Sequence, residues 1–134
     1  MLYVDNCESI LPRQLEGFFV GWPNPPSPEK HRELLEKSDA CVLAMDESTM
    51  MVVGFITAIS DHVLSAYIPL LEVLPEYQGH GIGTELVRRM LIKLSDLYMV
   101  DLLCDVGLQP FYERLGMRPA AGMIVRNYER QSGD

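Results

Sequence analysis

Residues 78–83, Gln-Gly-His-Gly-Ile-Gly, form the segment whose residue types and spacing point most directly to chemistry. They follow an apolar run that ends near Leu74 and precede a strongly amphipathic stretch. Glycines at the start of a helix let backbone N–H groups converge without obstruction by side chains, and the helix dipole adds partial positive charge. The segment therefore predicts a phosphate or pyrophosphate site, and the alternative is a plain glycine-rich turn between a strand and a helix.

The spacing of the glycines excludes two other phosphate-binding folds. A dinucleotide-binding fold needs Gly-x-Gly-x-x-Gly early in its sequence, with an acidic residue near the end of the next strand. Here Gly79, Gly81 and Gly83 are spaced Gly-x-Gly-x-Gly, and too little chain follows them for such a fold. A P-loop would end in Gly-Lys-Ser/Thr, and Gly83-Thr84 lacks the lysine.

With its neighbours, this segment resembles the acetyl-CoA-binding motif of the GNAT superfamily of N-acetyltransferases, (Gln/Arg)-x-x-Gly-x-(Gly/Ala). Gln78, Gly81 and Gly83 occupy its three specified positions. Residues 73–75, Val-Leu-Pro, are similar to the Val-x-Pro at the end of the family's fourth strand. Residues 111–117, Phe-Tyr-Glu-Arg-Leu-Gly-Met, are similar to its Phe-Tyr-x-x-x-Gly-Phe segment. The resemblance covers residues 40–128 and implies acetyl-CoA as the cosubstrate.

The resemblance also implies which residues hold this cofactor. They are Leu71, Val73, Gln78, Gly79, His80, Gly81, Ile82, Gly83, Thr84, Asp105 and Phe111. Two of them depart from the family's pattern: His80 stands where a basic residue is frequent, and Asp105 where an asparagine helps to hold the pantetheine arm. An ionised Asp105 accepts hydrogen bonds but cannot donate them. Both differences concern affinity for the cofactor rather than its identity.

The same resemblance implies a mechanism. Two parallel strands, within residues 70–74 and 97–104, are expected to diverge and hold acetyl-pantetheine between them. A neutral amine attacks the thioester directly, and a backbone N–H near Val73 stabilises the oxyanion of the tetrahedral intermediate. Tyr112 matches the family's general acid, which protonates the leaving thiolate. The alternative for Tyr112 is a half-buried aromatic side chain that packs a short helix.

Three carboxylates, Glu72, Asp101 and Asp105, lie in or directly after these two strands. By strand alternation Glu72 points away from the side of Leu71 and Val73, and it is the candidate general base for the amine. Three carboxylates around one slot would attract a cationic amine and could raise one another's pKa. The alternative is that Glu72 faces solvent or an arginine.

Aromatic residues are the candidates for the amine pocket. Trp22, in a proline-rich loop, and Tyr67 are expected to bind the substrate together with Asp101. Phe18 and Phe19 are adjacent, so we do not expect both rings to face the core, which favours a functional role for one of them. Core packing is nevertheless the preferred interpretation of either ring.

Other reactive side chains receive structural interpretations. His31 and His62 are expected at the surface. Cys104 is expected to be a small buried hydrophobe, because no histidine is placed to activate it. No spacing of ligands typical of a metal site is present.

The elements that must position these residues follow from periodicity and from turn signals. Strands are expected at residues 2–4, 40–45, 52–60, 66–74, 97–104, 117–119 and 122–128. Helices are expected at residues 29–37, 84–95 and 110–115, and in a first helix that carries Leu11, Leu15, Phe18 and Phe19. This order predicts an α/β (α+β) mixed sheet with one β-α-β crossover and helices on both faces. It matches the GNAT-like acyl-CoA N-acyltransferase fold that the resemblance implies.

Composition limits the class of protein and of partner. The 134 residues, 48% of them hydrophobic, are expected to form a single domain over residues 1–134. Eleven Lys+Arg against nineteen Asp+Glu give a net charge of −8. This charge repels nucleic-acid phosphates and anionic lipid, so we expect neither nucleic acid nor membrane as a partner. It favours cationic small molecules or polypeptides.

Targeting signals and cysteine usage predict the compartment. Residues 1–9 lack the basic segment of a signal peptide, and no apolar run is long enough to span a bilayer. Cys7, Cys41 and Cys104 are odd in number and far apart, which favours a reducing cytoplasm.

We therefore expect an acetyl-CoA-dependent N-acetyltransferase that acts on a primary amine of a small cationic molecule or of a lysine-bearing polypeptide. One alternative is an acyltransferase with a longer acyl-CoA donor, in which Leu71, Cys104 and Leu108 would set the depth of the slot. Another is a CoA-binding regulatory or structural module without turnover. The resemblance also allows a homodimer, for which no segment of the sequence gives an interface.

Overall fold

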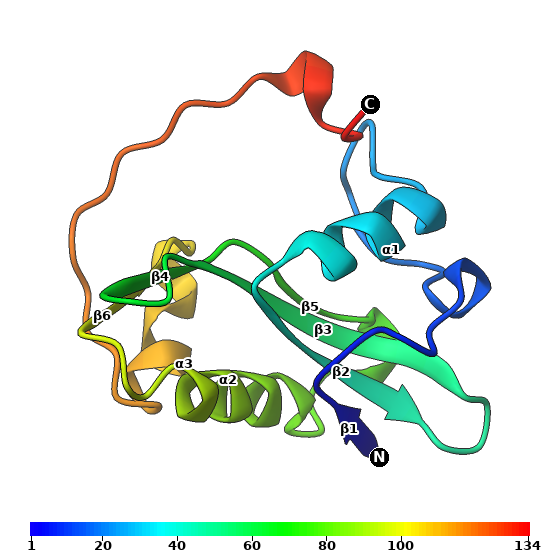
Figure 1. Cartoon of the computed structure of the whole chain (residues 1–134), viewed down its shortest axis with the longest axis horizontal. Helices are drawn as coiled ribbons and strands as arrows, with labels where there is room; N and C mark the ends of the chain where they lie inside the picture. The colour runs from blue at the N-terminus through cyan, green and yellow to red at the C-terminus, as the bar shows by residue number, and fades with distance from the viewer.

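A mixed sheet organises the computed structural model, which describes residues 1–134 (Figure 1). Its strands are β1 (Leu2–Val4), β2 (Ala40–Asp46), β3 (Met51–Ser60), β4 (Ser65–Ile68), β5 (Leu71–Val73) and β6 (Met99–Leu102). Their order is β1-β2-β3-β4-β6, and β5 pairs with β3. Every pairing is antiparallel except that of β4 with β6.

Helices lie on both faces of this sheet (Figure 1). They are α1 (Pro28–Lys37), α2 (Ile82–Lys93) and the short α3 (Gln109–Glu113). Single 3-10 turns occur at η1 (Pro12–Gln14), η2 (Pro75–Tyr77), η3 (Val106–Leu108) and η4 (Tyr128–Arg130). Because α2 connects the parallel strands β4 and β6, the predicted β-α-β crossover is confirmed. No helix has both the length and the apolar character needed to cross a membrane.

The core forms between these layers because the central strands are apolar on both sides. Residues 41–45 of β2 and 52–58 of β3 are buried without interruption, as in strands covered on both faces. On α2, Leu86, Val87 and Met90 are completely buried against the sheet. On α1, the side-chain oxygen of Ser27 accepts a hydrogen bond from the Lys30 N–H and caps the helix start.

The expected first helix is wrong. Only η1 forms there, and Gly17 has a φ of 89°, which a right-handed helix does not contain. Phe18 and Phe19 are both buried, at 9% and 4% exposure, contrary to the expectation that adjacent rings could not both face the core. The left-handed φ of 62° at Phe19 makes this possible, because it turns the second ring inward as well.

His31 is buried rather than exposed, at 1% exposure on the inner face of α1. Its ring lies 4.3 Å from that of Phe55 and also packs against Phe18 and Phe19. Neither ring nitrogen has a hydrogen-bond partner, and burial lowers the pKa of His31 to about 4. The imidazole is therefore a neutral member of an aromatic cluster.

The expected strand over residues 66–74 divides into two. Pro69 has no backbone N–H and cannot continue the ladder, so β4 ends at Ile68 and β5 begins at Leu71. The register against β3 shifts by one residue between the two, since Ile59 faces Tyr67 but Gly54 faces Val73. Only β4 continues the pairing to β6.

The strands expected at residues 117–119 and 122–128 are absent. Residues 118–127, which we call the arm, are exposed and extended, and residues 118–126 make no backbone-to-backbone hydrogen bond. A strand forms only against a partner, and no strand of this chain pairs with the arm. Figure 1 shows the arm as a wide arch from α3 to the region beside α1.

Candidate active site

The glycine-rich segment forms a tight loop between η2 and α2. Gly79 and Gly81 have φ values of 81° and 82°, and a Cβ at either position would meet no atom within 4 Å. The loop is therefore open to solvent on the side where the helix begins. Backbone N–H groups from Gly79 to Thr84 have no hydrogen-bond acceptor within the protein, since the first helical bond runs from Glu85 to Gly81.

Six successive free donors at the positive end of a twelve-residue helix can hold a phosphate group without any side-chain charge. The carboxylate of Glu85 in the first turn would oppose an anion. However, Arg88 and Arg89 bind it at 2.6 and 2.7 Å, and these bonds lower the pKa of Glu85 to about 2. The arginine pair thus neutralises the carboxylate nearest to the loop.

Two contacts tie this loop to β5. The side-chain amide of Gln78 donates a hydrogen bond of 3.0 Å to the Val73 carbonyl. Gly83 lies beside Val73, since a Cβ there would be 3.8 Å from the valine side chain. The register of β5 with β3 turns the N–H groups of Leu71 and Val73 away from β3. Because β5 does not pair with β6, the expected divergence of the two strands is present.

The two sequence motifs meet at the start of α2. A Cβ at Gly83 would lie 3.6 Å from the ring of Phe111, so α3 packs directly beside the loop. The rings of Phe111 and Tyr112 form an edge-to-face pair with centroids 4.9 Å apart. Burial, together with the neighbouring Cys104, raises the pKa of Tyr112. Its hydroxyl therefore stays protonated at neutral pH and can donate a proton.

Glu72 points away from Val73 and toward the α1 side of the sheet. Its carboxylate accepts hydrogen bonds from the N–H groups of Phe19, at 2.8 Å, and Val20, at 3.2 Å. The partners of this half-buried carboxylate within the protein are thus backbone N–H groups rather than an arginine. Glu72 anchors the loop whose left-handed residue Phe19 brings both phenylalanine rings into the core.

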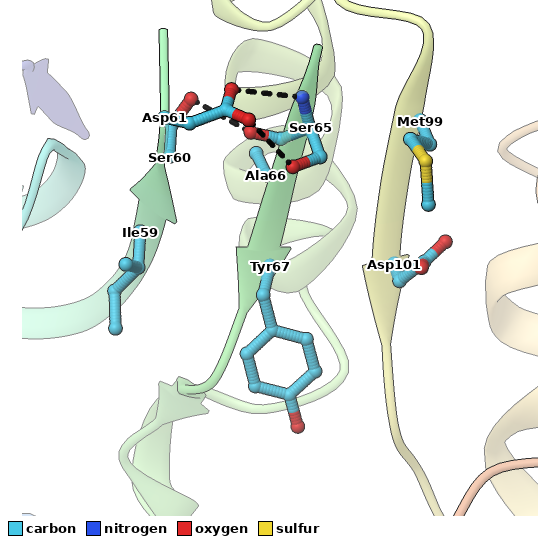
Figure 2. A pocket seen from close by; sticks show the side chains of 8 residues that line it. All are labelled: Ile59, Ser60, Asp61, Ser65, Ala66, Tyr67, Met99 and Asp101. Carbon is cyan, nitrogen blue, oxygen red and sulfur yellow. Dashed lines mark hydrogen bonds between the residues drawn. The ribbon is translucent and has the colours of Figure 1, made fainter.

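Tyr67 and Asp101 lie together in a shallow pocket of about 330 Å³ (Figure 2). Ile59 on β3, Tyr67 on β4 and Asp101 on β6 stand in one row across the sheet, because each is the register partner of the next. Asp61 borders the pocket and accepts hydrogen bonds from the N–H groups of residues 63–65. These bonds hold the pKa of Asp61 well below its usual range.

The other candidate residues are more scattered. Trp22 is 38% exposed, stacks on Phe19 at 4.9 Å and does not line this pocket. Asp105 is exposed at the start of η3, directly after β6. Sequence reasoning did not find Ile59 and Met99, which also line the pocket. The alternation of side chains along a strand predicts which residues share a face with Tyr67 or Asp101. It does not predict which strands are neighbours in the sheet.

Comparisons with known proteins agree with this geometry. The model of the acetyltransferase (GNAT) family matches residues 7–117. The crystal structure of a candidate acetyltransferase from Deinococcus radiodurans is 47% identical in sequence, with a TM-score of 0.94. The match covers 98% of this chain and 91% of the Deinococcus chain. This similarity extends into the arm. A GNAT family protein from Streptococcus pneumoniae is 28% identical over 94% of this chain and 98% of its own, with a TM-score of 0.67.

A curated relative is similar in sequence over most of its length. It is an N-acetyltransferase of Porphyra purpurea whose activity is uncharacterised, 25% identical over 86% of this chain and 69% of its own. The family match covers most of the chain and includes the glycine loop, β5, β6 and α3. This chain belongs to the GNAT family of acetyltransferases.

Proposed function

We propose that the protein transfers an acetyl group from acetyl-CoA to a primary amine of a small cationic molecule or of a lysine-bearing polypeptide. The observation that carries this proposal is the run of six free N–H groups from Gly79 to Thr84, beside two diverging strands. These donors suit a pyrophosphate, as the GNAT family's use of acetyl-CoA requires. Leu71, Val73, Asp105 and Phe111 are the proposed contacts of the pantetheine arm.

Two groups are proposed to act on the reacting thioester. The N–H of Val73, turned away from β3, donates to the oxygen on which negative charge develops. Tyr112 supplies the proton for the departing thiolate. Its raised pKa keeps the hydroxyl protonated, and its ring packs on Phe111, which lies beside Gly83 at the start of α2.

Glu72 remains the proposed general base, on the side of the sheet opposite to Val73. Two backbone donors already occupy its carboxylate, but each oxygen retains a second lone pair that can take a proton directly or through a water. Tyr67 and Asp101 are proposed to bind the cationic acceptor in their shared pocket. Trp22, which contacts Phe19, is proposed to bind the acceptor from the same face of the sheet. The three free cysteines fit a reducing compartment, and we propose the cytoplasm.

Calorimetric titration with acetyl-CoA, CoA and NADH tests the cofactor site. We expect the protein to bind acetyl-CoA and CoA but not NADH. Gly81→Asp should abolish this binding, because its carboxylate would stand where the pyrophosphate is held. Gly21→Asp is the matched control, since Gly21 has a φ of 83° and equally open surroundings in another part of the chain.

Thiol release then tests turnover. Amines of increasing positive charge are supplied with acetyl-CoA, and release of CoA is followed. A protein that binds acetyl-CoA but acetylates no amine would be a CoA-binding module. If folded Gly81→Asp binds acetyl-CoA as tightly as the wild type, the loop is not the phosphate site.

A further inference from the structure

The glycine loop, residues 78–83, contains nothing that fixes its own shape. Gly79 and Gly81 lie in the left-handed region, and the N–H groups from Gly79 to Thr84 form no hydrogen bond within the protein. Glycine loses more conformational freedom on ordering than any other residue. A ligand that had to order such a loop would bind more weakly, unless contacts outside the loop already hold both of its ends.

Core packing fixes the end of the loop that enters α2. Ile82, the first residue of this helix, is 4% exposed. A Cβ at Gly54 of β3 would lie 3.3 Å from the Ile82 side chain and 3.1 Å from that of Leu86, so the start of α2 rests directly on the sheet. The helix start is therefore held by the core, and only the entry into the loop remains to be fixed.

Tyr77, the last residue of η2, holds the entry into the loop. Its hydroxyl donates a 2.6 Å hydrogen bond to Oδ2 of Asp46, the last residue of β2. Bonds from a hydroxyl to a carboxylate at about 2.5 to 2.7 Å are charge-assisted and roughly twice as strong as neutral ones. This bond, together with those from Ser48, lowers the pKa of Asp46 to about 2, and it raises the pKa of Tyr77. The carboxylate therefore stays ionised and the hydroxyl protonated at neutral pH.

Asp46 is a firm anchor because its other atoms close the turn between β2 and β3. Its Oδ1 accepts hydrogen bonds from the N–H and the hydroxyl of Ser48, at 2.9 and 2.7 Å. Its carbonyl accepts the Met50 N–H at 2.7 Å, and the Met50 carbonyl in turn accepts a 2.8 Å bond from the side chain of Gln14. The hairpin is thus fixed independently of the loop, from which Asp46 is separated by 31 positions of sequence at Tyr77.

Tyr77 also contacts the loop itself. Its carbonyl lies 3.3 Å from Nδ1 of His80, which donates a hydrogen bond in the tautomer that carries its proton on that nitrogen. Tyr77 is also joined directly to Gln78, whose side chain binds the Val73 carbonyl. A single residue therefore connects the hairpin, through its hydroxyl, with the loop, through its carbonyl and its peptide bond.

We propose that Asp46 and Tyr77 are positioning residues for the cosubstrate, and that their hydrogen bond, which we call the clamp, keeps the glycine loop in the shape that receives the pyrophosphate. This inference rests on the proposed function of the loop and extends it to the hairpin between β2 and β3, which has no other part in the site. Neither residue touches the cofactor. The clamp raises affinity by removing the need to order the loop when acetyl-CoA binds.

Affinity for acetyl-CoA gives the first test. Tyr77→Phe removes the hydroxyl and keeps the ring, so calorimetry should give a Kd about five- to tenfold higher than that of the wild type. Tyr3→Phe is the matched control and should keep the wild-type Kd. Tyr3 is half-buried like Tyr77, but its hydroxyl has no hydrogen-bond partner, and a phenylalanine ring retains the contact with Arg89.

A double-variant cycle assigns the effect to the pair rather than to Tyr77 alone. Asp46→Asn removes the charge of the acceptor but keeps an oxygen for Ser48, and it should raise the Kd about two- to threefold in the wild-type background. In the Tyr77→Phe background the same change should leave the Kd where it is, because the hydroxyl that Asp46 holds is already gone.

Nuclear magnetic relaxation tests the ordering of the loop without any ligand. In the wild type, the amides of Gly79 and Gly81 should have order parameters near about 0.85, the value of rigid backbone. In Tyr77→Phe these should fall toward about 0.6, while those of α2 stay unchanged. A merely structural role of Tyr77 would lower the stability of the whole protein without this local change.

Each outcome decides a different point. If the wild type binds no acetyl-CoA, the proposed function is overturned, and this role of the clamp with it. If the wild type binds acetyl-CoA and Tyr77→Phe binds it equally tightly, only the clamp is overturned. Order parameters that are the same in wild type and Tyr77→Phe, or an equal loss of affinity in Tyr3→Phe, would also overturn it.

Discussion

Individual atoms rather than whole side chains carry most of the proposed chemistry. The phosphate site consists of backbone N–H groups, and the proposed oxyanion donor is the N–H of Val73. Apart from proline, no substitution removes these groups, so most variants at such positions act by obstruction or by displacement. Tyr112 and Glu72 are the exceptions, because the proposed acid and the proposed base are both side-chain groups.

Replacement of Tyr112 by phenylalanine should lower kcat by about 100-fold, since the leaving thiolate loses its proton donor. Affinity for acetyl-CoA should stay nearly unchanged, because the ring continues to pack against Phe111. Steady-state kinetics and calorimetry on the same preparation measure both quantities. Tyr98→Phe is the control, as Tyr98 is 83% exposed. An unchanged kcat in Tyr112→Phe would assign the proton to another group or to water.

At the scale of elements, the docking of α1 on the sheet depends on a neutral histidine. His31 has a pKa of about 4 in the folded protein against 6.5 when solvated, so the unfolded chain binds the extra proton between these values. The stabilisation that comes from the neutral His31 is complete above pH 6.5 and is lost as the pH falls toward 4. The carboxylate of Glu85 loses its contribution between about pH 4.5 and 2, which lies mostly below this range.

Unfolding by urea at pH 7 and at pH 4.5 should therefore show how much protonation of His31 lowers the free energy of unfolding. The wild type should lose about 2 to 3 kcal/mol more free energy of unfolding between these pH values than His31→Leu. Leucine removes the titration without breaking a hydrogen bond, because neither ring nitrogen has a partner. Parallel profiles for wild type and His31→Leu would contradict a buried, neutral imidazole.

Elements with one dominant period were predictable from the sequence. The apolar runs of β2 and β3 and the amphipathic α2 appear within a few residues of their expected bounds. The prediction of a first helix was wrong. Leu15 and Phe18 have helical spacing in the sequence, but they lie in a coil that contains left-handed residues. Pro69 divides the strand expected at residues 66–74, a break that we did not predict, and only the three-dimensional pairing shows that it shifts the register.

The candidate site also has features that could be predicted from the sequence and features that could not. The loop and Phe111 could be assigned to one site because the resemblance includes both of their motifs, but their direct packing was not predicted. The bonds from Glu72 to Phe19 and Val20 could not, since they join residues more than fifty positions apart. The arm shows the converse case, in which strand-forming residues are present but no strand of the chain pairs with them.

For the whole molecule, the net charge of −8 should act in opposite directions on the two proposed substrates. It attracts a cationic amine and repels the phosphates of acetyl-CoA, and both effects weaken as salt shortens the Debye length. The Debye length falls from about 30 Å at 0.01 M salt to about 8 Å at 0.15 M.

Added salt should accordingly raise the KM for a cationic amine while leaving the affinity for acetyl-CoA equal or stronger. Initial rates with the amine and calorimetry with acetyl-CoA, each at low and at high sodium chloride, measure the two responses. A neutral, uncharged amine serves as control and should show no increase in KM. Equal responses of the charged and neutral amines would exclude long-range attraction by the acidic surface.

The shift in register at Pro69 bears on how quickly the cofactor can enter. The divergence of β5 from β6 belongs to the hydrogen-bonded sheet itself, not to a loop that must move aside. The proposed cofactor region therefore exists before the ligand arrives, and we expect association without a preceding isomerisation. The observed rate of acetyl-CoA binding should therefore increase in proportion to its concentration, without a plateau, and differences in affinity among variants should arise mainly from the dissociation rate.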